Sequence, residues 1–438
     1  MAATHSAQDM VRPGECVDLY YYDGETSKKQ CFATTQNTKF VQVFANPNAG
    51  SSVFTIPPQN GIQDIVLSFE TNPVAGAGAA LAGITLPRGW GYALIKQVSF
   101  RYGGSSQYFL SGDQILQNAL RKQPSRTTVD DLFTLGGNFA SGAGGGAANL
   151  DTAQYAAVVL TLPHSTPSGV GKSHPLPTDA LTQQCQITVE LYPLSQILSV
   201  AAGNAAATTA AQGASMANAQ FQVQQVMFNN QGDALARRVD MAVNAYAYPA
   251  EFVQQIQRIP LASGTAAPQS VVLTGFRSGE VKAIHCWLTR AGDNPSPVAG
   301  AINQPFKWYL PDAVVMSYAG DIYARYEQQT SALWNLINGN KAPAVDNLEY
   351  TDAGGGNMTV PPAQWLSEWV ELPFAQTLVD EDAHNILVHG KPITNGIVNL
   401  QLSLPAAHVD GTADWVLNVS YLYNTTLLFS QGTCDYVF

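Results

Sequence analysis

A cluster of acidic residues and histidines between residues 380 and 389 is the segment most suggestive of metal chemistry. His384 and His389 lie five positions apart and follow Asp380, Glu381 and Asp382. Imidazole and carboxylate groups are common ligands of zinc and other transition metals. The same pattern is typical of a solvated acidic loop that leads into a β-strand, and we favour that interpretation. We therefore predict no metal site and no cofactor.

Two other sets of residues could hold a metal or form cross-links. His164 and His174 flank a loop rich in Ser, Pro and Gly, and the sequence places no third ligand beside them. The cysteines are odd in number, widely spaced and without a C-x-x-C pair, so we interpret them as reduced structural residues rather than a zinc site or a disulfide scaffold; they are Cys16, Cys31, Cys185, Cys286 and Cys434.

Hydrolytic chemistry has one candidate segment. Glu368 and Glu371 could act as paired carboxylates, and Trp365 and Trp369 beside them could form a platform for a sugar ring. Tryptophans of this kind are more often found in a core or an interface. No G-x-S-x-G elbow occurs, and the glycine-rich residues 142–146 lack the strand and helix of a dinucleotide site. We predict no catalytic residues, and a protein that is not an enzyme.

The charge of the chain argues against nucleic-acid binding. Only 12% of its 438 residues are charged and the net charge is −11. An acidic protein repels phosphate, and the nearest approach to a basic cluster, Arg277, Lys282 and Arg290, is sparse and suits a strand face. A weakly polar surface with few charges suits extended protein–protein contacts, because the centres of interfaces are depleted in charge.

Residues 1–14 are polar, and no apolar run reaches the length of about 18 residues that a membrane span needs. We expect neither a signal peptide nor a membrane span, and synthesis in a cytosol. Three N-x-S/T sequons occur. Asn357 lies in a glycine-rich loop and could be exposed, Asn418 lies within a predicted strand and should be unmodified, and Asn424 stays open.

Short apolar or alternating runs, separated by Gly, Pro, Asn and Ser, predict mainly β-structure. Ile187, Val189 and Leu191 alternate with polar residues, which predicts a strand with one buried face. The runs 398–404 and 415–421 alternate in the same way, with Trp415, Leu417, Val419 and Tyr421 on one face of the second run. Further strands are predicted at 39–44, 62–69, 93–102, 156–162, 221–228, 271–275, 281–289 and 385–389.

Helical patterns are few. Residues 112–120 place apolar side chains on one stripe, and residues 233–242 do so with Leu235, Val239 and Ala242. A third helix is predicted over 323–336, with Tyr326, Leu333 and Leu336 facing inward, and a helical or loose insertion over 201–220. Long loops are predicted at 72–83, 141–149 and 164–177.

The order of these elements predicts two β-sandwiches joined by a short helical connector. We divide the chain into an N-terminal arm (1–30), a first sandwich (31–229), a linker helix (230–249), a second sandwich (250–430) and a C-terminal tail (431–438). Alternating strands with long connections are typical of jelly-rolls, although strand count alone does not separate them from other sandwiches. The pattern predicts an all-β protein with two consecutive β-sandwiches and short helices in the connections.

Several segments resemble the major capsid proteins of icosahedral double-stranded DNA viruses, of the large-DNA-virus and virophage-like lineage. Residues 91–104 (GYALIKQVSFRYGG) resemble a strand and turn of the first jelly-roll in that family, and 112–120 take the place of the helix that follows, without its Trp. Residues 221–228 resemble the last strand of the first jelly-roll, and 233–239 the linker helix. Residues 248–257 resemble the opening of the second jelly-roll.

The resemblance continues to the C-terminus through 372–375, 389–396 and 421–424, so that it runs in order over about 54–430. It implies an all-β fold of two consecutive eight-stranded jelly-roll sandwiches that stand side by side. It also implies a structural protein of the virion, of which three chains form a pseudo-hexagonal capsomer. Neighbouring capsomers and minor and penton proteins are the implied partners. Loops at 72–83, 136–149 and 339–358 would contribute to the outer or intersubunit surface.

Two alternatives stay open. A minor capsid protein or vertex protein would usually carry one jelly-roll, which the double set of motifs disfavours. A secreted-type carbohydrate-binding or glycan-cleaving β-sandwich protein should have a signal peptide and an acidic cleft. Oligomeric state and sugar binding would distinguish these classes.

Overall fold

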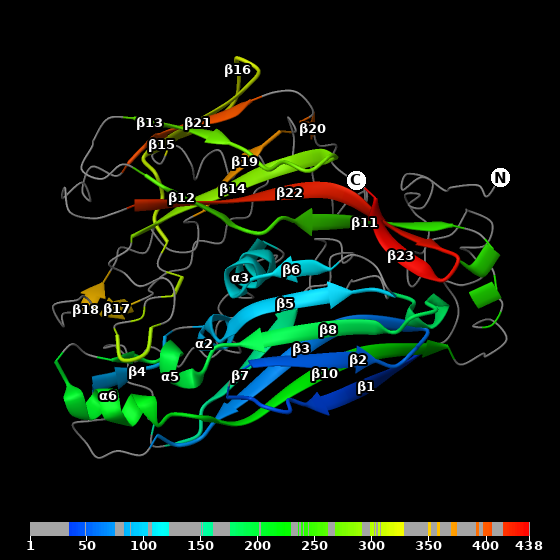
Figure 1. The fold of residues 1–438 in the computed structure, drawn as a ribbon, viewed down its shortest axis with the longest axis horizontal. Helices are drawn as coiled ribbons and strands as arrows, with labels where there is room; N and C mark the ends of the chain where they lie inside the picture. The colour runs from blue at the N-terminus through cyan, green and yellow to red at the C-terminus, as the bar shows by residue number, and fades with distance from the viewer. Residues whose placement is uncertain are drawn as a thin grey trace.

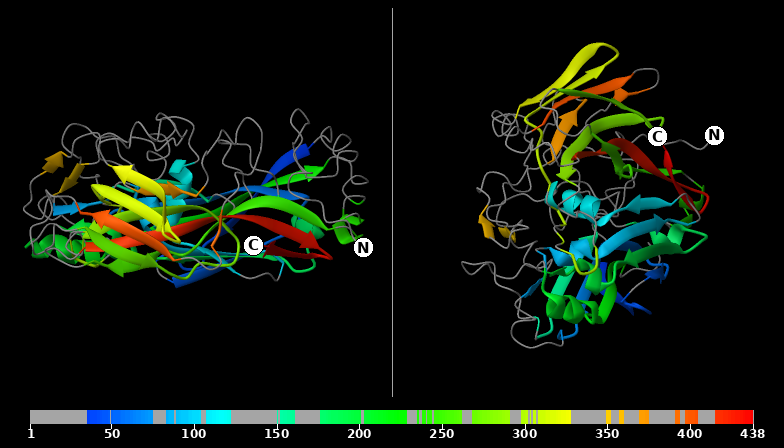
Figure 2. Two further views of the ribbon diagram at one scale, coloured as in Figure 1. Left: turned by 90° about the horizontal axis from the view of Figure 1, so that it is seen from above. Right: turned by 60° about the vertical axis from the view of Figure 1, so that its left-hand side comes forward.

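The computed structural model describes residues 35–121, 150–160, 176–228, 235–290, 298–327, 349–359, 369–374, 391–404 and 415–437, with short gaps inside several of these ranges. Strands in the described residues build two β-sandwiches, the first up to residue 228 and the second from residue 246 onward (Figure 1). The strands of both sandwiches run roughly along the long axis of the molecule, so the sandwiches lie side by side (Figure 2). The predicted N-terminal arm, 1–30, lies outside the described residues.

The first sandwich consists of two four-stranded antiparallel sheets. One sheet has the order β1 (Thr35–Val43), β10 (Met216–Phe228), β3 (Gly61–Thr71) and β7 (Tyr155–Leu160). The other has the order β2 (Gly50–Ile56), β8 (Cys185–Leu191), β5 (Ile95–Arg101) and β6 (Tyr108–Leu110).

The second sandwich repeats this plan. One sheet has the order β11 (Tyr246–Val253), β22 (Trp415–Ser430), β14 (Glu280–Arg290) and β19 (Val370–Pro373). The other has the order β13 (Gln269–Leu273), β21 (Val398–Ser403), β15 (Ala313–Tyr318) and β16 (Asp321–Glu327). Three more strands extend the first of these sheets: β12 (Gln257–Pro260) and β23 (Thr433–Val437), which pair with β22, and β20 (Lys391–Pro392), which pairs with β14.

Both sandwiches have the strand order of a jelly-roll. Among the eight strands of these two orders in each sandwich, the first (β1 or β11) lies beside the last (β10 or β22), which lies beside the third (β3 or β14). The second (β2 or β13) pairs with the next-to-last (β8 or β21) in the facing sheet. The first strand therefore pairs with a strand that comes after all the others of its sandwich in the chain, so these contacts are long-range in sequence. The predicted all-β class with two jelly-rolls is confirmed.

Alternation in the sequence explains which strand faces form the core. In β8 the predicted residues Ile187, Val189 and Leu191 are buried while their neighbours are exposed or half-buried. In the first sandwich the rings of Phe54 and Phe221, from opposite sheets, stack with centroids 4.3 Å apart. Such pairs join the two sheets, because offset aromatic stacking adds to the free energy of burial.

The predicted helix at 323–336 is wrong in its described part, because residues up to Glu327 belong to strand β16. Tyr318 pairs directly with Asp321, so β15 and β16 form a hairpin with a two-residue loop. Ala319 and Gly320 in that loop both have positive φ, at 53° and 96°. This is the type I′ geometry that joins twisted strands, and it keeps the chain extended beyond the turn.

Two other predicted elements shift in extent, and a third is confirmed. The strand expected at 93–102 starts at Ile95, because helix α2 (Trp90–Ala93) occupies the residues before it. The insertion at 201–220 contains helix α6 (Ala205–Gln212), but β10 already starts at Met216. The helix at 112–120 is confirmed as α3 (Gly112–Arg121), with its apolar stripe buried.

The predicted linker helix buries a different face from the one we expected. Its described residues, 235, 238–239 and 241–243, are helical, but Leu235 and Val239 are exposed and Met241 is buried. The predicted C-terminal tail is instead strand β23, which pairs with the end of β22 through a tight turn at Gln431 and Gly432. The predicted strand at 385–389 lies outside the described residues.

The remaining elements lie in connections. They are β4 (Ile84–Thr85) with β9 (Ser199–Val200), the hairpin of β17 (Glu349–Thr351) and β18 (Asn357–Thr359), helix α5 (Leu194–Ile197) and the 3-10 turn η2 (Thr178–Ala180). The hairpin overlaps the end of the loop that was predicted over 339–358. Of the loops predicted at 72–83, 136–149 and 164–177, the larger parts lie outside the described residues.

Candidate functional site

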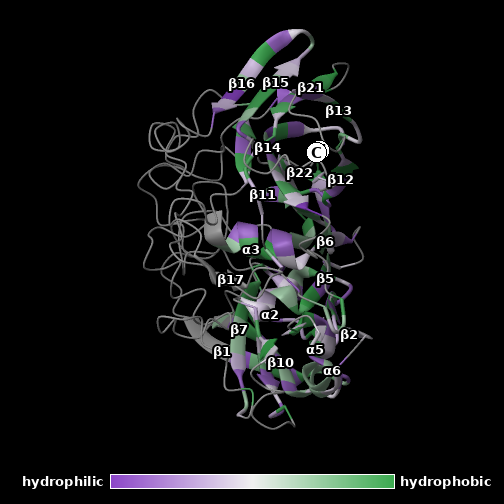
Figure 3. Cartoon of the chain, turned by 90° about the vertical axis from the view of Figure 1, so that its left-hand side faces the viewer, coloured by the Kyte–Doolittle hydropathy of each residue, from purple (hydrophilic) through white to green (hydrophobic). Residues whose placement is uncertain are grey.

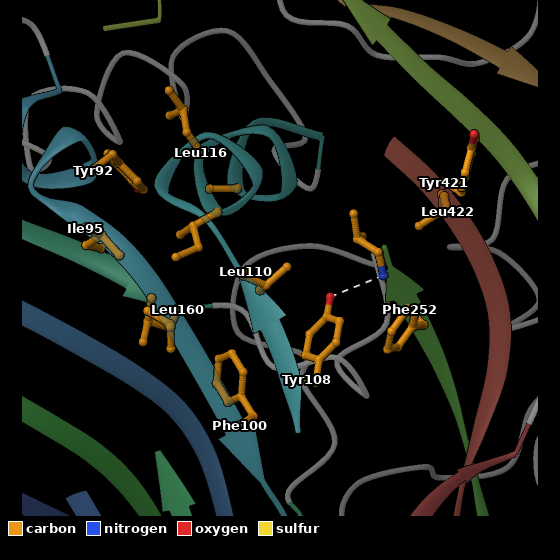
Figure 4. Packing of buried hydrophobic residues seen from close by; sticks show 14 of the residues in the cluster. Tyr92, Ile95, Phe100, Tyr108, Leu110, Leu116, Leu160, Phe252, Tyr421 and Leu422 are labelled. Carbon is orange, nitrogen blue, oxygen red and sulfur yellow. Dashed lines mark hydrogen bonds between the residues drawn. The ribbon is translucent and has the colours of Figure 1, made fainter. Parts of the chain in front are cut away.

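The contact between the two sandwiches is an apolar cluster from three strands. Tyr108 on β6, Phe252 on β11 and Tyr436 on β23 have ring centroids between 4.9 and 5.7 Å apart. The backbone N–H of Val253 donates to the Tyr108 hydroxyl at 3.3 Å (Figure 4). An edge strand of the first sandwich is thereby covered by an edge strand of the second, so no open sheet edge is left at this place.

Helix α3 lies beside this cluster, between the sandwiches (Figure 3). The Gln114 side chain is buried and its Nε2 donates to the backbone oxygen of Gln254 at 2.6 Å, so α3 is bound to the second sandwich. Burial raises the pKa of Asp113 to about 6, although the charge of Arg258 on β12 acts in the opposite direction. The helix therefore carries polar groups into the contact, and they have partners across it.

A second link between the sandwiches is made by Asn303, which belongs to the connection between β14 and β15. Its side-chain nitrogen donates to the backbone oxygens of Gln196 at 2.7 Å and Leu198 at 2.8 Å in the first sandwich. Its side-chain oxygen accepts from the N–H of Val298 at 2.9 Å. A buried amide with all these bonds fixes the position of the connection, because losing any partner would leave a desolvated polar group.

The sheet of β11, β22, β14 and β19 carries polar residues that are buried. Ser420, His285 and Glu371 are direct cross-strand partners on three adjacent strands, and His285 Nε2 lies 3.4 Å from a Glu371 carboxylate oxygen. The residue types are those of a hydrolytic triad. Ser420 is fully buried, however, so its hydroxyl is out of reach of a substrate and the row is structural.

A buried ion pair lies in the same sheet. Lys282 Nζ is 3.0 Å from a carboxylate oxygen of Glu251, and both side chains are almost inaccessible. Alternation in the sequence does not mark Lys282 or Glu251 as buried. The buried polar residues Asn418 and Ser420 of β22 do alternate with the apolar residues of the core face. This alternation predicted that they lie on an exposed face, whereas both are buried.

The basic residues considered for nucleic acid do not form a patch. Lys282 is buried in the ion pair, Arg277 lies over the ring of Phe252 at 4.7 Å, and Arg290 lies over the ring of Trp415 at 5.4 Å. Each cation is thus used in a local contact within the second sandwich.

The candidate sugar platform does not exist at Trp369. Its side chain is buried, and its ring packs edge-on against Trp308 with centroids 6.1 Å apart. The carboxylate of Glu371 faces His285 rather than a cleft. Trp365 and Glu368 lie outside the described residues. Trp369 is therefore a core residue.

Of the other candidate residues, those between 380 and 389 and His164 and His174 lie outside the described residues. Within the described residues, no group of three or more His, Cys, Asp or Glu could hold a metal ion. Cys185, Cys286 and Cys434 are buried free thiols, and burial raises the pKa of Cys185 and Cys286 to about 12, so neither is a reactive thiolate. No described helix is long and apolar enough to cross a membrane.

The sequons differ in accessibility. Asn418 is buried, and its side-chain nitrogen donates to Thr289 Oγ1 at 3.0 Å, which agrees with the prediction that a glycan would not fit there. Asn424 lies in β22 between two paired strands, with its side-chain oxygen buried. Asn357 starts strand β18.

Comparisons with solved structures find the same architecture. PBCV-1 VP54, whose crystal structure was fitted into a cryo-EM reconstruction of the virophage Sputnik, has a TM-score of 0.61 over 93% of this chain and 97% of its own, at 13% identity. The fold is the double jelly-roll. The double jelly-roll is also found in the mavirus major capsid protein, with a TM-score of 0.54 at 11% identity over 92% of this chain and 90% of its own.

The Faustovirus major capsid protein is a third structure with this double jelly-roll, with a TM-score of 0.53 at 14% identity over 91% of each chain. No protein-family model matches the chain, and no curated protein matches it in sequence. The likeness is therefore carried by the strand order and the packing of the two sandwiches, and not by shared residues.

Proposed function

We propose that this protein is a major capsid protein that forms trimeric, pseudo-hexagonal capsomers of an icosahedral viral shell. The observation that carries the proposal is the double jelly-roll over nearly the whole chain, shared with the mavirus and Faustovirus major capsid proteins. The protein acts in this role by burying lateral surfaces and has no catalytic step. Its location is the virion, after synthesis in the host cytoplasm.

The way the two sandwiches meet supports a ring. Inside the chain, edge strand β6 of the first sandwich meets edge strand β11 of the second, so the contact joins two different edges. The corresponding edges that remain are β16 in the second sandwich and β1 in the first, and they lie at opposite ends of the molecule (Figure 1). A contact between unlike surfaces can be repeated from copy to copy until a ring closes.

Exposed apolar side chains mark both of these outer edges. Ile322 on β16 is 69% exposed, and Val41 and Val43 on β1 are 48% and 63% exposed. We propose that β16 of one chain lies against β1 of the next, as β6 lies against β11 within the chain. Six sandwiches then form the ring, two from each of three chains. Neighbouring capsomers, and minor and penton proteins, would bind the outside of this ring.

The test is the mass of the purified protein in solution, by light scattering after size exclusion, with negative-stain images of the peak. One chain is 46.7 kDa, and we expect a trimer of about 140 kDa that appears as a six-lobed disc. A monodisperse monomer without ring-like particles would overturn the capsomer proposal. In that case glycan-array binding would be measured next, although nothing in the described residues favours a sugar site.

A further inference from the structure

The buried ion pair of Lys282 and Glu251 joins two strands that are not neighbours. Lys282 is on β14 and Glu251 is on β11, and β22 lies between them in the sheet. The Lys282 side chain must therefore pass over β22 to place Nζ 3.0 Å from the Glu251 carboxylate. A charged pair inside a protein is costly to desolvate, so its presence suggests a purpose beyond stability.

The residue of β22 that lies directly opposite Glu251 is Asn424. It is the cross-strand partner of Glu251 in β11 and of Glu280 in β14, and directly opposed residues in antiparallel strands project from the same face. The pairing of β14 with β22 shifts between Val281 and Ala283, which makes Lys282 the extra residue of a bulge. The Asn424 side-chain oxygen is buried. The Lys282 amine therefore lies against the Glu251 carboxylate, and the half-buried Asn424, directly opposite Glu251, projects from the same face of the sheet.

We propose that Lys282 and Asn424 become joined by an amide bond between their side chains, with Glu251 as the group that moves the protons. A neutral amine is a nucleophile, and an amide carbon held beside it is its electrophile. The fold supplies what the reaction lacks in water, because it holds both groups beside the Glu251 carboxylate and limits their access to solvent. This is a modification of the chain by itself, without a cofactor.

The steps balance as follows. Glu251 takes a proton from the Lys282 ammonium, and the free Nζ attacks Cγ of Asn424. Glu251 delivers that proton to the side-chain nitrogen of Asn424 and takes the second proton from Nζ as the C–N bond breaks. Ammonia leaves with three hydrogens, two from Asn424 and one from Lys282, and the new bond is Nζ–Cγ. No oxidant or other reactant is required.

The new bond would connect β14 with β22, the two central strands of this sheet. Residues 283–423 would then lie in a covalent loop that stays closed when the protein unfolds. The reaction would also remove the Asn424 amide nitrogen, to which a glycan would have to be attached, so Asn424 would not be a glycosylation site.

The deciding measurement is the mass of the full chain after denaturation, followed by tryptic peptide mapping. We expect a mass about 17 Da below that of the sequence, the mass of ammonia. We also expect no cleavage after Lys282, and a branched peptide whose fragments join Lys282 to Asn424. A full-length chain of unmodified mass would overturn the proposal. So would a loss of 17 Da with normal cleavage after Lys282, because that result indicates a cyclised asparagine.

Two variants complete the experiment. Glu251→Gln should abolish the mass loss, and Lys96→Met should retain it. Lys96 pairs with Glu190 at 2.6 Å on the surface of the first sandwich, and it is the matched control for removing a lysine from an ion pair. If Glu251→Gln fails to fold, the double variant Lys282→Met with Glu251→Gln removes both buried charges and should fold with unmodified mass apart from the substitutions. A retained loss of ammonia in either variant would contradict the assigned roles.

Discussion

The rings of Tyr108 and Phe252 lie 4.9 Å apart, although one belongs to the first jelly-roll and the other to the second. We predict that Phe252→Ala lowers the free energy of unfolding by about 3–5 kcal/mol, because it leaves a cavity at the junction. Chemical denaturation followed by tryptophan fluorescence would measure this. Val53→Ala, at an exposed site on β2, is the control and should change the free energy of unfolding by less than about 0.5 kcal/mol.

Asn303 should stabilise the second link between the sandwiches, as Phe252 stabilises the first. Asn303→Ala removes the bonds to Gln196 and Leu198 and leaves their carbonyl oxygens without this donor. We expect a loss of about 2–4 kcal/mol in the free energy of unfolding. Hydrogen exchange should show faster exchange at Val200, whose N–H donates to the oxygen of Ala301 in the same connection. Unchanged exchange there would contradict the role of Asn303 in holding it.

Asp113 should make stability depend on pH. Burial raises its pKa in the folded protein from 3.8 to about 6, so the folded state holds the proton more tightly than the unfolded state. Its contribution to the free energy of unfolding is therefore largest below pH 3.8 and is lost as the pH rises to about 6. Asp113→Asn should stabilise the protein at pH 7 by about 1–2 kcal/mol, after allowance for partial exposure, with no gain at pH 3.5. Equal effects at both pH values would show that charge is not the cause.

The outer edge strands β1 and β16 should be required for the trimer but not for folding of the single chain. We predict that Val43→Asp and Ile322→Asp each convert the trimer to a folded monomer, because a charge would have to be buried against the next chain. Light scattering measures the mass, and circular dichroism confirms the β-structure. Leu235→Asp, at a 59% exposed site in the linker helix, should leave the trimer intact. If both edge variants stay trimeric, the proposed contact between β16 of one chain and β1 of the next is wrong.

Much of the fold follows from local pattern. Alternation located β8, β21 and the core face of β22, since a side-chain period of two with one buried face leaves a visible trace in the sequence. The same argument failed at residues 323–327, where a two-residue turn at Ala319 and Gly320 outweighed a helical spacing of apolar residues. It also failed for the C-terminal residues, whose strand pairs only because the end of β22 is available.

The all-β class and the two sandwiches could be predicted from alternation and turn residues, which are local signals. The link to viral capsid proteins rested instead on the resemblance of several segments to that family. The tertiary structure was needed to show that Lys282 pairs with Glu251 opposite Asn424, that Ser420 is buried beside His285, and that Trp369 is a core residue. These groups are far apart in sequence and meet because the jelly-roll places its last strand between its first and third, and no local pattern records that pairing.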